Sequence, residues 1–329
     1  MSTDPIDFVI PWVDDADKEW RKKYKKYKHD EANDEARYRD WDILKYWFRG
    51  VEKYAPWVNK IHFITCGQKP DWLDETNPKL NLVNHVDYIP EKYLPTFSSH
   101  TIELHLSKIQ GLSDKIVYFN DDMFLINEVS KNDFFVNDLP CDMATLYPNS
   151  VNGEDTQFDH ILLNDAEFFE KNFDIKKVIQ KNKNGWLNLK YGKNLLKTLC
   201  LLPFPAFPGI MLLHQPQSLV KETLIEVEAN AKELIDETSR HKFRTSEDIN
   251  QYIFRYWQLG KGKFFPYNIL KRGKYFPIEP NADYQGILNS KYKIVCLNDG
   301  NKDIDFDLEK KRLVSAFEKK LPNKSSFEK

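Results

Sequence analysis

The sequence predicts an α/β fold with a mostly parallel sheet and a helical insert in its C-terminal half. Two observations carry this prediction. In the first 125 residues, short runs rich in β-branched and aromatic residues alternate with segments whose apolar residues recur at helical spacing. From about residue 160 to 260 the pattern becomes mostly helical. Alternating strands and helices are typical of a parallel sheet covered by helices.

The N-terminal elements follow from these local patterns. Strands are expected at the short apolar runs 6–13, 60–65, 80–86 and 115–119. Helices are expected at 42–54 and 98–111. The second helix has Ser98 available as an N-cap and Gly111 as a stop signal.

The C-terminal half is expected to be an insert that leads back to the core. Amphipathic helices are predicted at 167–181 and 218–238, separated by a proline-punctuated loop at 201–217. A returning strand at 292–299 and a closing helix at 306–321 follow, and the tail 322–329 is expected to be frayed. The sequence thus predicts one composite domain, with a core at about 5–150 and 290–322 and the insert at about 155–265.

Composition excludes several classes of protein. Hydrophobic residues at 41% exclude a disordered chain, and a formal charge of −2 gives no overall basic field of the kind that nucleic-acid binding favours. The basic run at 21–28 is better explained as a solvated helix face or loop, although a local basic patch stays open. The four cysteines contain no C-x-x-C, which argues against a zinc site or a disulfide framework and favours small buried thiols. No signal peptide and no apolar run of membrane-spanning length is seen, so a cytoplasmic protein is expected.

Polar clusters follow three of the predicted strands, where ligands of such sheets bind. Asp121 and Asp122 come directly after the strand at 115–119, with Asn120 beside them. Adjacent carboxylates repel and require a positive partner. Mg²⁺ or Mn²⁺ would suit them, because both ions take carboxylate oxygens together with substrate phosphates. A capped turn is the alternative for the same residues.

Two further clusters follow the first and second strands. Asp14, Asp15 and Asp17 follow the first strand, where a D-x-D string could hold a metal–diphosphate or, alternatively, begin a helix. Trp12 could stack on a base or sugar ring, or belong to the core. Gly67 and Gln68 follow the second strand and offer an approachable backbone and an amide.

Two residues of the C-terminal half are candidates for acid–base and anion-binding roles. His214 lies in a proline-bounded loop, from which it could act as a general base or serve as a structural histidine. Arg244 stands just before a predicted helix, where it could grip a phosphate or simply pair with Glu247 or Asp248.

The order of these segments resembles a known family. "IDFVIPWVDDAD", "RYRDWDILKYWFRGVEKYAPWVNKIHFITCGQKPDWL" and "LPTFSSHTIELHLSKIQGLSDKIVYFNDDMFL" resemble the first two conserved regions of the Stealth family, with Arg49 kept in the helix motif. "PGIMLLHQPQSL" and "FRTSEDINQYIFRYWQLGKG" resemble its third and fourth regions. The family comprises bacterial capsular polysaccharide phosphotransferases and the animal N-acetylglucosamine-1-phosphotransferase.

The resemblance implies a nucleotide-sugar-transferase-like fold, of the GT-A or Rossmann-like kind, and a sugar-phosphate transferase. Such an enzyme would move a hexose or N-acetylhexosamine 1-phosphate from a nucleotide-diphosphate sugar, with UDP-sugar expected, to a glycan hydroxyl. The acceptor could be lipid-linked, with at most peripheral contact at the inner membrane face. The implied metal ligands are Asp121 and Asp122, and the implied catalytic residues are His214, Arg244 and Asp121. The implied substrate-binding residues are Trp12, Asp14, Asp17, Arg49, Gly67, Gln68, Glu103 and Asn120.

Three other functions stay open from the residues alone. A metal-dependent glycosyltransferase on the same kind of fold would release a nucleoside diphosphate. An inactive glycan-binding or assembly protein would bind without turnover. A phosphohydrolase would use two carboxylates and a metal without needing an acceptor.

Overall fold

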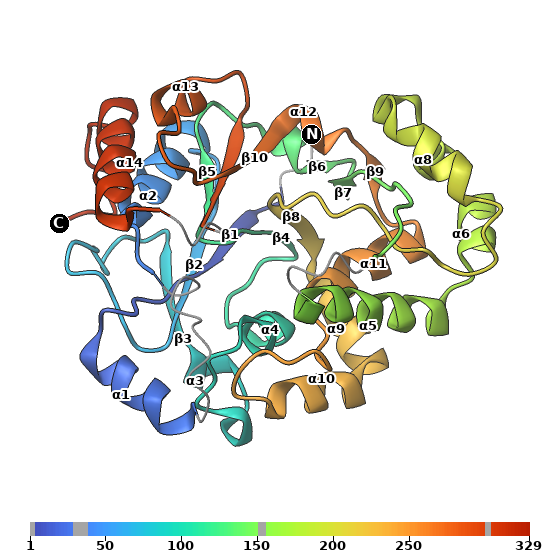
Figure 1. The fold of residues 1–329 in the computed structure, drawn as a ribbon, viewed down its shortest axis with the longest axis horizontal. Helices are drawn as coiled ribbons and strands as arrows, with labels where there is room; N and C mark the ends of the chain where they lie inside the picture. Colours follow the sequence, from blue (N-terminus) through green and yellow to red (C-terminus); the bar gives the residue numbers. More distant parts are fainter. Residues whose placement is uncertain (1–3, 29–38, 151–155, 300–303) are drawn as a thin grey trace.

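A five-stranded sheet with the order β3-β2-β1-β4-β8 runs through the molecule (Figure 1). The computed structural model describes residues 4–28, 39–150, 156–299 and 304–329. The first four strands are parallel and β8 is antiparallel to β4. The strands are β1 (Ile6–Pro11), β2 (Ile61–Thr65), β3 (Leu80–Asn84), β4 (Lys115–Tyr118) and β8 (Gln217–Val220). The predicted α/β fold with a mostly parallel sheet is confirmed, and the order 3-2-1-4 is that of a doubly wound sheet.

Different helices cover the two faces of this sheet. Along β1, Phe8 and Val9 belong to separate hydrophobic clusters, because successive side chains of a strand point to opposite faces. The cluster around Phe8 includes α2 (Leu44–Tyr54) and α14 (Phe306–Lys320). The cluster around Val9 includes α4 (Ser99–Leu104), α9 (Lys221–Asn230), α10 (Lys232–Arg240) and α11 (Tyr252–Lys261).

Further elements flank the central sheet. A second sheet has the order β10-β11-β5, in which β11 is parallel to β10 and antiparallel to β5. Its strands are β5 (Met123–Leu125), β10 (Gly273–Pro277) and β11 (Ile294–Asn298). A third, small sheet has the order β6-β7-β9 and consists of β6 (Phe135–Val136), β7 (Leu139–Asp142) and β9 (Phe265–Pro266). The remaining helices are α1 (Lys18–Tyr27), α3 (His85–Tyr88), α5 (Thr156–Asn172), α6 (Ile175–Lys181), α7 (Lys183–Trp186), α8 (Asn194–Leu201), α12 (Ile269–Arg272) and α13 (Tyr284–Leu288). No helix among the described residues is long and apolar enough to cross a membrane.

Three predicted helices differ from the observed ones. The helix expected at 98–111 is α4 followed by a 3₁₀ turn at Leu106–Lys108, and the Ser98 side chain makes no capping hydrogen bond. The helix expected at 167–181 is broken where Asp174 caps the start of α6. The helix expected at 218–238 begins as β8, because the backbone of Ser218–Val220 pairs with β4 before the chain turns into α9 and α10.

The expectation of a frayed C-terminal tail is wrong. Phe327 is 2% exposed and its ring lies 5.2 Å from that of Phe48 on α2. The guanidinium of Arg49 donates to both carboxylate oxygens of Glu328, at 2.8 and 2.7 Å. Arg49 also donates to the carbonyl of Leu321 at 2.8 Å. The tail is therefore bound to α2 by a bidentate ion pair whose two side chains are almost wholly buried.

Removing one partner of this pair should destabilise the protein strongly. We expect Arg49→Ala to lower the free energy of unfolding by about 3–5 kcal/mol, since it leaves the buried Glu328 carboxylate without its partner. Urea unfolding measures this change. The matched control is Lys69→Ala, which breaks the exposed pair with Glu75 and should cost less than about 1 kcal/mol. Equal losses in the two variants would contradict the buried clamp.

Candidate active site

The carboxyl ends of β1 and β4 border a cleft of about 340 Å³. This is the switch point of the sheet, where β2 and β3 extend to one side of β1 and β4 lies on the other. Ligands of doubly wound sheets bind at that point. Seven of the predicted site residues line the cleft: Trp12, Glu103, Asn120, Asp121, Asp122, His214 and Arg244.

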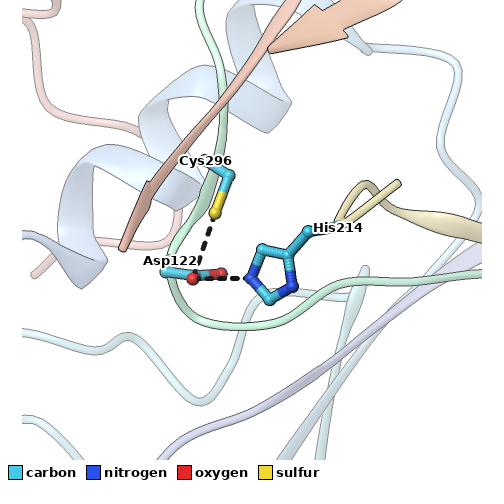
Figure 2. Close-up of side chains that lie close together, drawn as sticks. All are labelled: Asp122, His214 and Cys296. Atoms are coloured by element: carbon cyan, nitrogen blue, oxygen red, sulfur yellow. Dashed lines mark hydrogen bonds and ion pairs between the residues drawn. The ribbon is translucent and has the colours of Figure 1, made fainter. Parts of the chain in front are cut away.

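The register of β4 and β8 brings Asp122 and His214 together. Tyr118 of β4 pairs with Gln217 of β8, and the two strands are antiparallel. The four residues after Tyr118 and the three residues before Gln217 therefore lie beyond the same end of the two strands, the carboxyl end of β4. His214 Nε2 lies 3.0 Å from Asp122 Oδ2 as a result (Figure 2).

Asp122 is held by three hydrogen-bonding groups from two segments, the loop before β8 and the strand β11. Besides His214, the Cys296 thiol of β11 lies 3.1 Å from Asp122 Oδ2 (Figure 2). The Asn298 amide of the same strand also lies 3.1 Å from this oxygen. Burial favours the neutral acid, but these hydrogen bonds and the charge of His214 outweigh it and lower the pKa of Asp122 below its usual value. Asp122 is therefore a carboxylate at neutral pH. Its other oxygen, Oδ1, is buried and makes no hydrogen bond to any residue that the structure describes.

The backbone of His214 adopts a conformation that non-glycine residues rarely occupy. Its φ is +40°, in the left-handed region. Strained backbone of this kind persists where the surroundings hold it, and it is concentrated at functional sites. The imidazole is one-third exposed, so its Nδ1 edge can reach the cleft while Nε2 faces Asp122. Burial lowers the pKa of His214, but the hydrogen bond to Asp122 and the charges of Asp122 and Asp121 outweigh burial and raise this pKa above its usual value.

The oxygen atoms of Asp121 and Asp122 fit a hard divalent cation. Asp121 lines the cleft. Removal of its carboxyl from water raises the pKa of Asp121 to about 7, and the charge of Asp122 acts in the same direction. A cation would remove this repulsion and would also satisfy Asp122 Oδ1. Asp122, His214 and Cys296 also lie close enough together to form a possible metal-binding group. Burial and the Asp122 charge raise the pKa of Cys296 far above neutrality, so the thiol keeps its proton and donates it to Asp122.

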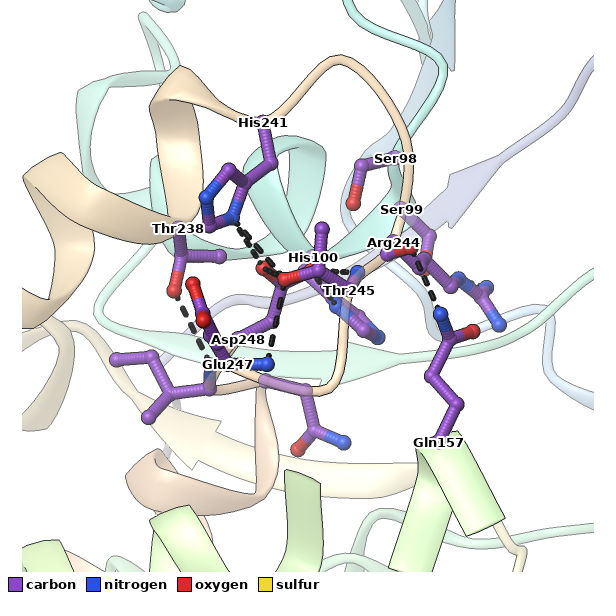
Figure 3. Close-up of polar contacts among 12 residues, drawn as sticks. Ser98, Ser99, His100, Gln157, Thr238, His241, Arg244, Thr245, Glu247 and Asp248 are labelled. Atoms are coloured by element: carbon purple, nitrogen blue, oxygen red, sulfur yellow. Dashed lines mark hydrogen bonds and ion pairs between the residues drawn. The ribbon is translucent and has the colours of Figure 1, made fainter. Parts of the chain in front are cut away.

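Arg244 reaches the cleft from a loop that Asp248 organises (Figure 3). Asp248 accepts from the Thr245 amide at 3.0 Å and from the Thr245 hydroxyl at 2.8 Å. Its carboxylate also contacts Nδ1 of His100 at 2.9 Å and of His241 at 2.7 Å. Arg244 itself donates to the Ser99 hydroxyl at 2.6 Å, so the guanidinium is held at the cleft rather than paired with Asp248.

Glu103 lines the cleft from α4 and is almost wholly buried. It accepts a hydrogen bond of 2.8 Å from the Tyr118 hydroxyl. Burial raises the pKa of Glu103 to about 7, and the opposing charge of Arg244 offsets this only in part. The carboxyl is consequently poised between its neutral and charged forms at physiological pH.

The other predicted site residues lie outside the cleft lining. The backbone N–H of Asp14 donates to Gln68 Oε1 at 2.9 Å, and Gln68 Nε2 donates back to the Asp14 carbonyl at 2.7 Å, which joins the loops after β1 and β2. Gly67, with φ at +97°, lies in the loop after β2, directly before Gln68. Asp17 caps α1 by accepting from the Trp20 amide. Arg49 binds the C-terminal tail.

The comparisons with known proteins agree with the resemblance. Conserved regions 1 and 2 of the Stealth proteins match residues 4–32 and 37–141. The capsular polysaccharide phosphotransferase WcwK of Streptococcus pneumoniae is 44% identical over 98% of each chain. The exopolysaccharide phosphotransferase cps2G of Lactiplantibacillus plantarum is 38% identical, over 98% of this chain and 96% of its own. This chain belongs to the Stealth family.

Solved structures offer a more distant likeness to this Stealth protein. The bifunctional glycosyltransferase WbbM aligns with a TM-score of 0.46 and 12% identity, over 98% of this chain and 50% of that chain. A likeness this distant says nothing about the reaction.

Several residues of the Stealth site carried no signal in the sequence. Cys296 and Asn298 lie on a strand that was predicted, but nothing in it indicated that their side chains would meet Asp122. Arg39 and Asp299 also line the cleft, with 3.9 Å between Arg39 Nε and Asp299 Oδ2. His85 lines it too, and burial lowers the pKa of His85 to about 4, so its imidazole is neutral.

The environment of Glu103 predicts a pH-dependent effect on stability. Because the folded protein raises the pKa of Glu103 to about 7, keeping this group charged opposes folding above that pH, and the penalty disappears as the pH falls towards 4.5. We therefore expect Glu103→Gln to raise Tm at pH 8 and to change it little near pH 4.5. Thermal unfolding at the two pH values measures this. The control is Glu233→Gln, at an exposed position on α10. If Glu103→Gln changed Tm by the same amount at both pH values, the raised pKa of Glu103 would be refuted.

Proposed function

We propose that this chain transfers a sugar 1-phosphate from a nucleotide-diphosphate sugar to a glycan hydroxyl during capsular or exopolysaccharide synthesis. The observation that carries the proposal is the match over 98% of both chains to a relative named as a capsular polysaccharide phosphotransferase. The cleft supports it, since it combines two carboxylates, a histidine held by one of them and a nearby arginine. The enzyme class expected from the sequence agrees with the names of these relatives.

The reaction exchanges one P–O bond for another. The acceptor hydroxyl attacks the phosphorus attached to the sugar, and the bond from that phosphorus to the oxygen of the nucleoside monophosphate breaks. A phosphodiester forms, the nucleoside monophosphate leaves with the electron pair, and the hydroxyl proton must be removed. Phosphoryl transfer of this kind depends mainly on positioning and on charge stabilisation.

His214 is suited to accept that proton. When Nε2–H donates to the Asp122 carboxylate, the lone pair of Nδ1 is left at the cleft side of the ring. Asp122 fixes this tautomer and stabilises the imidazolium that forms, as an aspartate does beside a catalytic histidine in hydrolases. Asp122 is thus both a positioning residue for His214 and a candidate cation ligand.

Arg244 and the two carboxylates would meet the diphosphate. Arg244 can place its planar guanidinium against phosphate oxygens from the Ser99 side of the cleft. Asp121 and Asp122 would hold Mg²⁺ or Mn²⁺, which supplies charge neutralisation of the diphosphate when bound. Trp12 and Asn120 line the same cleft and would contact the nucleotide sugar. UDP-sugar as the donor, a lipid-linked acceptor and a cytoplasmic location remain parts of this proposal, as does a single composite catalytic domain.

Identification of the released nucleotide tests the proposal. The protein is incubated with a panel of nucleotide-diphosphate sugars, Mg²⁺ or Mn²⁺, and a crude capsular glycan. We expect nucleoside monophosphate that appears only when the glycan is present. Nucleoside diphosphate would indicate a conventional glycosyltransferase, and monophosphate released regardless of acceptor would indicate a phosphohydrolase.

Substitution of the two interacting residues should separate their roles. We expect His214→Ala to reduce kcat by about 10²–10⁴-fold with a smaller effect on donor affinity, because it removes only the proton acceptor. Asp122→Asn should abolish turnover while the protein remains folded, because it removes a cation ligand and the charge that holds His214. Steady-state kinetics and circular dichroism measure these effects. His160→Ala, exposed on α5, is the matched control, and near-normal rates in either site variant would remove that residue from the mechanism.

A further inference from the structure

Helix α8 buries polar residues and exposes two leucines, although its Leu195 and Leu201 pack against the core. Its polar residues Asn194 and Thr198, one turn apart, are 4% and 0% exposed, and the Thr198 hydroxyl accepts from the Leu146 amide. On the outer side, Leu196 is 62% and Leu199 45% exposed. A surface helix normally turns its apolar side towards the core, so leucines facing outward call for an explanation.

The exposed apolar residues continue on both sides of α8. Leu189, in the turn before the helix, is 87% exposed, and Phe204, just after it, is 52% exposed. Figure 1 shows α8 at the outer edge of the molecule, on the side away from α2 and α14. Other large exposed hydrophobic residues, such as Val86, Ile225 and Leu308, come from separate elements. We call Leu189, Leu196, Leu199 and Phe204, together with the lysines among them, the α8 surface.

The sequence that contains α8 carries charge of one sign. Asp and Glu make up 50 of the 329 residues, yet none occurs from 175 to 221. The same stretch contains Lys176, Lys177, Lys181, Lys183, Lys190, Lys193, Lys197 and Lys221. In the described part of the chain, Lys190, Lys193 and Lys197 form no ion pair with an acidic residue. Instead, Lys190 and Lys197 extend over the rings of Phe265 and Tyr147.

We propose that the α8 surface binds an anionic lipid bilayer as a peripheral membrane contact. Leucine and phenylalanine side chains flanked by lysines are the combination that enters the boundary between acyl chains and negatively charged headgroups. The apolar side chains supply area to bury, and the unpaired lysines supply attraction to the headgroups. The acid-free stretch favours this occupant over a second copy of the chain, because two like-charged surfaces would repel each other. The inference does not depend on the proposed reaction.

Co-sedimentation with vesicles tests this inference. The full chain is mixed with vesicles of phosphatidylcholine alone or of phosphatidylcholine with phosphatidylglycerol, at low and high salt. We expect binding to the anionic vesicles only, and weaker binding as salt rises. Lys193→Glu should weaken binding by at least about fivefold, and Leu196→Ser/Leu199→Ser by about tenfold or more. The matched control is Ile225→Ser/Lys232→Glu on α9 and α10, which should bind like the unaltered protein.

A fluorescent label at Cys200 reports whether α8 itself meets the lipid. Cys200 is the exposed residue among the four free cysteines and lies on α8. We expect an environment-sensitive dye there to shift to the blue with anionic vesicles. Absence of binding, equal binding to both kinds of vesicle, or unchanged binding by the leucine variant would overturn the proposal. Concentration-dependent dimers in light scattering that disappear in the leucine variant, without vesicle binding, would assign the surface to a second copy instead.

Discussion

The contact between Asp122 and His214 is the constraint on which the rest of the cleft depends. It joins the end of β4 to the loop that enters β8, and Cys296 and Asn298 add β11 to the same carboxylate. A buried carboxylate is costly unless hydrogen bonds and opposite charge compensate it. Hydrogen bonds from His214, Cys296 and Asn298 offset that cost at Oδ2. The other oxygen, Oδ1, is left for a cation. The chemistry of the cleft thus depends on a carboxylate that contacts both β11 and the loop before β8.

The antiparallel strand β8 explains how residues so far apart in sequence meet. A parallel β8 would deliver His214 to the opposite edge of the sheet, away from Asp122. Because β8 runs against β4, its entering loop arrives at the edge where β4 ends. The positive φ of His214 then turns the imidazole at the point of entry. Arg244 is fixed independently, through the contacts of Asp248 with Thr245, His100 and His241.

Much of the fold and the centre of the site could be predicted from the sequence. The first four strands and the carboxylates that follow β4 have strong local signals, since strand periodicity and polar strand ends are visible in short windows. β8 was hidden because Leu219 and Val220 also fit the apolar spacing of the helix that follows them. The tail appeared frayed because a short polar segment shows its burial only through Arg49 and Phe48, which are remote in sequence. Cys296 and Asn298 could not be found, because their role exists only through the pairing of β11 with β5.

The central claim concerns which bond to phosphorus breaks, and the fate of the phosphate attached to the donor sugar tests it most directly. A donor labelled at that phosphate is incubated with glycan acceptor and divalent cation, and the glycan and the released nucleotide are then separated. We predict that the label is found in the glycan, in a phosphodiester seen by ³¹P NMR. Label retained in a released nucleoside diphosphate, with unlabelled sugar on the glycan, would contradict the account.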